Sequence, residues 1–244
     1  MKYFVWHGRG SKCVEHYKSL SNKSYNNTKC IVVSAKNKGE LSPKDKTFND
    51  KTWLENYCDL LGINHISLIM DTDYHNTAYV SKIKYFYEYL LNCQYEYALV
   101  SDSTDCVIVK NPDDAISLLD KYECDILYGT SRFHDWVDFT MPERANFCVK
   151  LYKNVSVNTG VCLARVDTLL KLYERVLEYA DDTISASDYH KIYRSNNGYR
   201  NWSKEQLSQF PKGVGCDQVI IKYLFRDFYP KLKLDISGLL TNNR

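Results

Sequence analysis

The sequence lacks any run of 18 apolar residues, so we expect no helix that crosses a membrane. The first twelve residues, MKYFVWHGRGSK, lack the long apolar core of a secretory signal peptide, and we therefore expect a cytoplasmic protein. An excess of one charge is also missing, because 32 Lys and Arg against 30 Asp and Glu leave a net charge of +2. By charge alone, neither nucleic acid nor an anionic membrane surface is an expected partner.

The nine cysteines include no C-x-x-C pair. Most of them stand beside apolar residues, as in KCIVV and GVCLA, and their number is odd. We interpret them as reduced and mostly buried thiols, as is typical of a cytosolic protein. The sequence also lacks internal repeats, low-complexity tracts and a clear linker. With 44% hydrophobic and 25% charged residues, the composition is that of one globular domain spanning residues 1–244.

In the first half, β-branched apolar runs alternate with amphipathic segments. The short run KYFVWH is one expected strand. Other strands are predicted at 29–35, 65–70, 97–101 and 124–130, and helices at 49–61, 79–91 and 111–122. This alternation favours parallel pairing in a doubly wound α/β sheet. Ligands bind such sheets at the carboxyl ends of the strands, where Ser34, Asp71 and Asp102 fall.

The second half is less regular. A strand is predicted around GVCLA, and helices at 167–179 and 216–229. Between these two helices, residues 181–215 are polar and we expect them to be rich in loops.

Two pairs of carboxylates follow predicted strands. Asp71 and Asp73 lie in LIMDTDYH, and Asp102 and Asp105 lie in LVSDSTDCVIV. Either pair could be an ordinary turn, because Asp side chains readily bond to nearby backbone N–H groups. The second pair differs in its setting, since it stands between an apolar strand and the β-branched run CVIV. Carboxylates placed there can share Mg²⁺ or Mn²⁺, which a departing diphosphate needs as charge builds on its oxygen.

The first pair raises a different chemistry. Haloacid-dehalogenase phosphatases place a nucleophile and an acid as Asp-x-Asp at a strand end, as Asp71 and Asp73 are placed here. The phosphatase pattern continues to Thr or Val two positions after the second Asp, whereas this chain has His75. The pair also follows the second main strand rather than the first.

The segment ALVSDSTDCVIVKNPDDAISLL resembles the metal corner of GT-A glycosyltransferases. It is most similar to the branch containing the glycosyltransferase domains of collagen lysyl hydroxylases and related proteins of large DNA viruses. Three further segments follow in the order of that family, over roughly 29–240. The residues that match are Lys82 in the helix before the metal strand, Asn158, Thr159 and Gly160 in VNTG, and Asp217 and Gln218 in CDQ.

The resemblance implies a GT-A, Rossmann-like fold with a mostly parallel sheet and a single domain. Residues 29–130 would form the nucleotide-binding half and residues 131–244 the acceptor half. The implied activity is transfer of a sugar from a nucleotide diphosphate, a UDP-sugar above all, to a hydroxyl group of a glycan or protein. The branch that this chain resembles leans towards retention of the anomeric configuration, whereas inversion would need a base near the acceptor.

The resemblance also implies a role for each matching residue. The cation, Mn²⁺ or Mg²⁺, would be bound by Asp102 and Asp105. The implied donor-binding residues are Ser34, Ala35, Lys82, Asp102, Asn158, Thr159, Gly160 and Gln218, and the implied catalytic residues are Asp217, as the candidate base, and Asn158.

This chain departs from the family in three places. Cys216 replaces the first Asp of the D-D-Q helix start, and Thr104 replaces the aromatic residue that often packs on the nucleotide base. The family usually closes with leucine-Asp-His, whose His is the third protein ligand of the metal; here Asp235 is followed by Ile236. These departures leave a second hypothesis open, a GT-A-like protein that binds a nucleotide or glycan without catalysis.

The histidines outside two predicted loop segments have no partner at metal-ligand spacing and stay unassigned. The two loop segments themselves offer aromatic and polar side chains that could bind an acceptor. The acceptor candidates are His134, Asp135 and Trp136 in YGTSRFHDWVDF, and Tyr189, Tyr193, Tyr199 and Trp202 in the polar stretch.

Overall fold

The structure is a computed structural model of the chain. It describes residues 2–7, 24–38, 51–71, 79–132, 144, 147–153, 155–180, 203, 205 and 215–242. The acceptor candidates at positions 134–136 and 189–202 lie outside these residues, as do Asp73 and His75.

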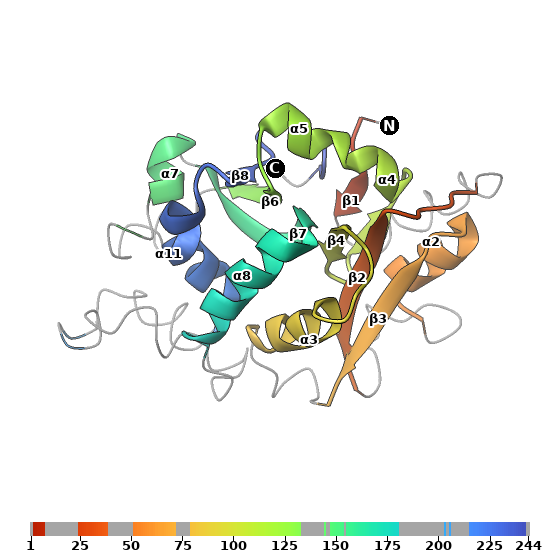
Figure 1. The fold of residues 1–244 in the computed structure, drawn as a ribbon, viewed down its shortest axis with the longest axis horizontal. Coiled ribbons are helices and arrows are strands. Elements are labelled where there is room, and N and C mark those ends of the chain that lie inside the picture. Colours follow the sequence, from red (N-terminus) through yellow and green to blue (C-terminus); the bar gives the residue numbers. More distant parts are fainter. Residues whose placement is uncertain are drawn as a thin grey trace.

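A six-stranded sheet forms the centre of the molecule (Figure 1). Its strands are β2 (Cys30–Asn37), β3 (His65–Met70), β4 (Tyr97–Ser101), β6 (Ile126–Arg132), β7 (Val155–Arg165) and β8 (Leu232–Leu234), in the order β3-β2-β4-β7-β6-β8. β7 pairs antiparallel with both of its neighbours, and the other pairs are parallel. The sheet is therefore mixed but mostly parallel, as the alternating sequence pattern predicts.

Helices cover both faces of this sheet. They are α2 (Trp53–Leu61), α3 (Ser81–Leu90), α4 (Pro112–Ala115), α5 (Ser117–Tyr122), α7 (Phe147–Leu151), α8 (Val166–Leu177) and α11 (Asp217–Phe228). The expected helix at 111–122 is divided into α4 and α5 at Ile116, whose N–H bonds to Asp113 O in a tighter turn.

The ends of α2 illustrate how local sequence fixes an element. Thr52 and Glu55 form a capping box, in which each side chain accepts a hydrogen bond from the other residue's backbone N–H. Gly62 ends the helix with φ of 64°, a left-handed conformation that costs glycine little.

The core has two layers because strand side chains alternate between the faces of the sheet. Ile31 and Val33 of β2 point into the layer beneath α3, α8 and α11, where the rings of Phe86 and Tyr173 stack 6.3 Å apart. Val32 points into the opposite layer with α2, α4 and α5. β7 comes from the second half of the chain yet lies between β4 and β6, so the two halves share one sheet.

The two ends of the described chain meet beside this sheet. β1 (Val5–His7) pairs antiparallel with β5 (Cys106–Ile108) in a second, two-stranded sheet, and His7 lies opposite Cys106. The N–H of Val5 also donates to Leu240 O at 2.8 Å. The predicted strand at the start of the chain is therefore present, but it belongs to neither edge of the main sheet.

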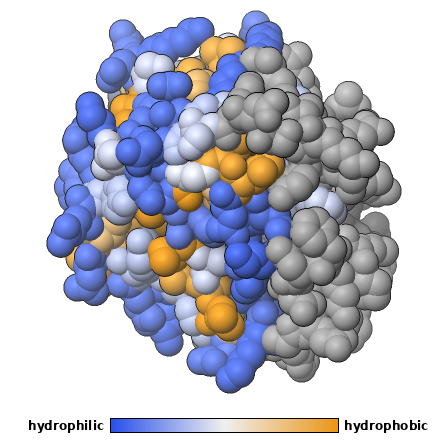
Figure 2. Space-filling model, turned by 90° about the vertical axis from the view of Figure 1, so that its right-hand side faces the viewer, coloured by the Kyte–Doolittle hydropathy of each residue, from blue (hydrophilic) through white to orange (hydrophobic). Residues whose placement is uncertain are grey.

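Among the described residues on the face that Figure 2 shows, hydrophilic residues separate small hydrophobic groups. Within the described ranges, no helix combines the length and apolarity that crossing a membrane requires.

Candidate functional site

Asp102 follows β4 directly, at the carboxyl end of a central strand. Its N–H donates to Gly160 O on β7 at 2.8 Å, which extends the β4–β7 pairing by one residue. The Ser103 hydroxyl donates to Ala35 O of β2 at 3.0 Å, and Leu54 N–H of α2 donates to Ser103 O at 3.4 Å. Residues 101–105 (SDSTD), which we call the corner, are thus held by β4, β7, β2 and α2, so they form more than an isolated turn.

Lys82 joins the corner to the start of α11. Its Nζ lies 3.0 Å from Asp102 Oδ1 and 3.3 Å from Asp217 Oδ2, and its side chain is only 18% exposed. Burial lowers the pKa of Lys82, but the charges of Asp102 and Asp217 raise it by more, so the ammonium form is favoured. Burial raises the pKa of Asp102, yet the charge and hydrogen bond of Lys82 bring it below its ordinary value. The two residues are therefore both charged at neutral pH.

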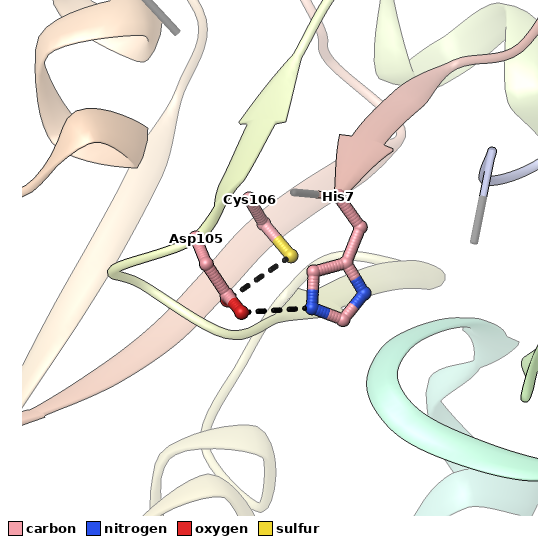
Figure 3. A group of neighbouring side chains, drawn as sticks. All are labelled: His7, Asp105 and Cys106. Carbon is pink, nitrogen blue, oxygen red and sulfur yellow. Dashed lines mark hydrogen bonds and ion pairs between the residues drawn. The ribbon is translucent and has the colours of Figure 1, made fainter. Parts of the chain in front are cut away.

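Asp105 contacts His7, a histidine near the start of the chain (Figure 3). His7 Nε2 lies 3.0 Å from Asp105 Oδ2, and the Asp105 side chain is 46% exposed. Burial lowers the pKa of His7, but the hydrogen bond and charge of Asp105, with the charge of Asp102, raise it above its usual value overall. The Cys106 thiol donates to Gly160 O at 3.7 Å and lies 3.9 Å from Asp105 Oδ1.

Gly160 lies against both halves of this cluster. A Cβ at this position would lie 2.7 Å from Asp102 Oδ2, 2.8 Å from His7 Cε1 and 2.9 Å from Asn158 Oδ1. Real Cβ atoms essentially never approach so closely, so any side chain here would displace the carboxylate and the imidazole. The close approach explains glycine at this position, where φ is not in the left-handed region.

The donor atoms at this corner fit a divalent cation. One ligand atom each from His7, Asp105 and Cys106 lies within 4.8 Å of the others. The carboxylate oxygen of Asp105 suits Mg²⁺ and Mn²⁺, the imidazole nitrogen of His7 suits transition metals, and the soft sulfur of Cys106 suits neither Mn²⁺ nor Mg²⁺. The half-exposed Asp105 carboxylate keeps the corner open to solvent and hence to a ligand.

The remaining predicted site residues differ in burial and in whether they contact the corner. Ser34 lies within β2 rather than after it, and its hydroxyl donates to Ser67 at 3.3 Å while only 1% of the residue is exposed. Ala35 touches the corner through its carbonyl. Asn158 and Thr159 are half-buried on β7, and Asn158 Oδ1 accepts a hydrogen bond from Gly160 N–H at 2.8 Å. Gln218 is half-buried in the first turn of α11.

Asp235 has a structural environment. Its carboxylate is 1% exposed and accepts hydrogen bonds from the N–H groups of Leu239, Leu240 and Thr241 and from the Tyr122 hydroxyl. The next side chain, Ile236, is 55% exposed.

Asp71, the described member of the first carboxylate pair, lies after β3 at the edge of the sheet. Its side chain is largely exposed and lies 3.4 Å from Lys38 Nζ. The edge position separates it in the strand order from the corner after β4.

His7 is a site residue that the sequence did not indicate. No spacing pattern could have found it, because His7 and Asp105 are 98 positions apart and meet only through the pairing of β1 with β5. The one available signal was that both short runs, VWH and CVI, were β-like segments without an assigned partner.

Comparisons with known proteins find matches among solved structures only. No protein-family model and no curated protein sequence matches this chain. One of these solved structures is described as "a glycosyltransferase involved in the glycosylation of the major capsid of PBCV-1". The match covers 85% of this chain and 81% of that one. The sequence identity is 19% and the TM-score is 0.43. At these values the similarity assigns neither a family nor an activity to this chain.

Proposed function

We propose that this protein is a GT-A-like glycosyltransferase that transfers a sugar from a nucleotide diphosphate, of which a UDP-sugar is the first candidate, to a hydroxyl acceptor. One observation carries the proposal: Asp102 and Asp105 follow a central strand of a mostly parallel sheet, where Asp102 contacts Lys82 and Gly160 and Lys82 also pairs with Asp217. Those residues come from three separate segments that the family resemblance relates to donor binding.

Asp102 and Asp105 would hold the divalent cation, Mn²⁺ or Mg²⁺. When bound, such a cation neutralises the charge that builds on the diphosphate as the glycosidic bond breaks. Lys82 adds a fixed positive charge beside Asp102, so a diphosphate placed here would meet an ammonium group as well. Ser103 binds Ala35 and holds the corner against β2, where the nucleoside would lie.

The sugar would lie over the start of β7 and the start of α11. Gly160 leaves room for close backbone approach, and Asn158 holds the N–H of Gly160 through its carboxamide oxygen. The carboxamide nitrogen of Asn158 and the side chain of Gln218 are then the polar groups that would orient the sugar hydroxyls.

Asp217 is the residue whose part in the reaction depends most on stereochemistry. With Lys82 3.3 Å away and only 3% of Asp217 exposed, its Oδ2 is occupied by an ion pair. An acceptor proton would reach this oxygen only after Lys82 turned towards a bound phosphate. In the present arrangement Asp217 orients Lys82, which agrees with the retaining route that needs no enzyme base at the acceptor.

The test is donor hydrolysis by the purified chain, with a panel of nucleotide sugars and with Mn²⁺, Mg²⁺ or EDTA. Nucleotide diphosphate release should require the cation and should fall at least about a hundredfold in Asp105→Asn, since a transition-state charge loses its partner. Asp120→Asn, which changes an exposed carboxylate on α5, is the matched control and should keep full activity.

Two results would overturn the proposal. Donor hydrolysis by Asp105→Asn at the wild-type rate would show that the Asp105 carboxylate is not needed for the reaction. Binding of a nucleotide sugar, seen as a raised melting temperature, without hydrolysis of any donor would favour the catalytically silent nucleotide- or glycan-binding protein instead.

A further inference from the structure

We propose that His7 is a third protein ligand of the cation at the Asp102–Asp105 corner, and that its imidazole makes the corner prefer Mn²⁺ to Mg²⁺. The inference rests on the proposed function only in taking that corner as the cation site. It gives a histidine ligand to a chain whose Ile236 can bind no metal.

The separation of the donor atoms fits two neighbouring ligands of one ion. His7 Nε2 and Asp105 Oδ2 are 3.0 Å apart. Ligands about 2.1 Å from an octahedral ion, at right angles to each other, are about 3.0 Å apart. The pair therefore needs no large rearrangement to receive a cation.

Asp102 approaches the His7 ring at Gly160. Asp102 Oδ2 and His7 Cε1 both lie within 2.8 Å of the point where Gly160 would carry a Cβ. The missing side chain of Gly160 thus leaves space for the imidazole and the Asp102 carboxylate, while Asp105 meets the same imidazole at Nε2.

The backbone of His7 is held firmly enough to present a preformed ligand. β1 is paired with β5, in which His7 lies opposite Cys106, and His7 N–H donates to Asn242 Oδ1 at 2.7 Å. Val5 N–H is bound to Leu240 O in the C-terminal segment. Strand pairing on one side and the C-terminal segment on the other therefore fix where the imidazole lies.

An imidazole beside the carboxylates should favour Mn²⁺ over Mg²⁺ as the bound cation. Mg²⁺ prefers oxygen ligands and keeps much of its water, whereas Mn²⁺ binds a given nitrogen-containing site more readily. Cys106 lies at the base of the cluster with its thiol on Gly160 O, and its sulfur is a poor ligand for either ion. Replacing the imidazole should therefore weaken Mn²⁺ binding more than Mg²⁺ binding.

The experiment uses the full chain and Mn²⁺ alone. Electron paramagnetic resonance counts the bound Mn²⁺, and electron spin-echo modulation detects ¹⁴N from a coordinated imidazole. We expect ¹⁴N modulation that is replaced by ¹⁵N modulation after ¹⁵N-histidine labelling. His7→Ala should abolish it and raise the Kd for Mn²⁺ about ten- to a hundredfold, while His65→Ala, a histidine of β3, should change neither.

A second variant guards against loss of folding. If His7→Ala lowers the melting temperature strongly, His7→Phe keeps an aromatic ring in β1 but has no nitrogen, and it should lose the modulation equally.

The outcomes separate the two proposals. Tight Mn²⁺ binding without histidine modulation overturns the role of His7 and leaves the glycosyltransferase proposal standing, and so does modulation that survives in His7→Phe. Absence of Mn²⁺ binding at millimolar concentration also overturns the role of His7. Modulation that depends on His7, in a protein that hydrolyses no donor, supports the ligand and counts against the proposed activity.

Discussion

Replacing Asp235 by Asn should destabilise the protein much more than the loss of one charge at a surface would. Asp235 Oδ1 accepts from Leu239 N–H at 3.0 Å and from the Tyr122 hydroxyl at 2.8 Å. Oδ2 accepts from Leu240 N–H at 2.8 Å and from Thr241 N–H at 3.1 Å. An NH₂ group at Oδ2 would face two backbone N–H donors, and one at Oδ1 would face Leu239 N–H and a Tyr122 hydroxyl that can turn to accept. Rotation of the carboxamide therefore always leaves at least one backbone N–H facing a donor.

The magnitude follows from the number of hydrogen bonds lost. A hydrogen bond to a charged group contributes about 1.5–3 kcal/mol; at least one is lost inside a site that is almost fully buried, and the others lose their charge. We expect Asp235→Asn to lower the free energy of unfolding by about 3–4 kcal/mol. Tyr122→Phe removes the bond to Asp235 and the one from the exposed Ser237 N–H, and should lower it by about 1–2 kcal/mol. For a chain of this size, about 4 kcal/mol corresponds to roughly 10 °C in Tm.

Urea denaturation and thermal melts of the two variants measure these differences. The comparison is informative because both variants remove hydrogen bonds that the Asp235 carboxylate accepts. A loss under about 1 kcal/mol in Asp235→Asn would refute the reasoning, since the four hydrogen bonds could not then contribute as their charge and burial require. A larger loss in Tyr122→Phe than in Asp235→Asn would refute it as well.

Two other predictions concern the corner and the first helix. Gly160→Ala should lower Mn²⁺ affinity and donor hydrolysis about tenfold or more while changing Tm little, because its Cβ displaces the ligand side chains rather than the core; unchanged Mn²⁺ affinity would contradict the close approach. Burial raises the pKa of Glu55, but the hydrogen bonds from Lys36 and Thr52 outweigh it and leave the pKa lowered. Its contribution to stability is therefore complete above the unfolded pKa of about 4.3 and is lost as the pH falls through the lower folded value. Glu55→Gln should thus be less stable at pH 7 and show a flatter decline in unfolding free energy between about pH 5 and pH 3, and a decline equal to that of the wild type would argue against it.

Features set by local sequence could be predicted well. The helix at 53–61 has its capping residues Thr52 and Glu55 within one turn and its stop at Gly62, so eleven adjacent residues specify it. Residues 30–33 and 97–100 form apolar runs because both faces of the sheet are covered there, and such runs are visible without any partner. The same holds for the position of Asp102, which needs only the end of a strand to be recognised.

Pairings between distant segments could not be predicted. Nothing near residue 160 indicates that β7 would insert between β4 and β6, although this insertion brings Gly160 against Asp102. Ser34 was expected at the carboxyl end of its strand, but β2 continues to Asn37 and leaves Ser34 buried beside Ser67. Burial and register depend on which strand lies alongside, and a single sequence carries no direct record of that choice.

The substitution at Ile236 acquires a different meaning from these contacts. A missing ligand histidine after Asp235 would suggest that the corner has lost its cation. Yet Asp235 is turned inwards to hold the backbone of Leu240 and Thr241, and Leu240 O in turn binds Val5 of the strand that carries His7. The C-terminal segment therefore contributes to the corner by supporting β1 rather than by supplying a side chain. If His7 binds the cation, position 236 is released from that role, and an exposed isoleucine there is compatible with an intact metal site.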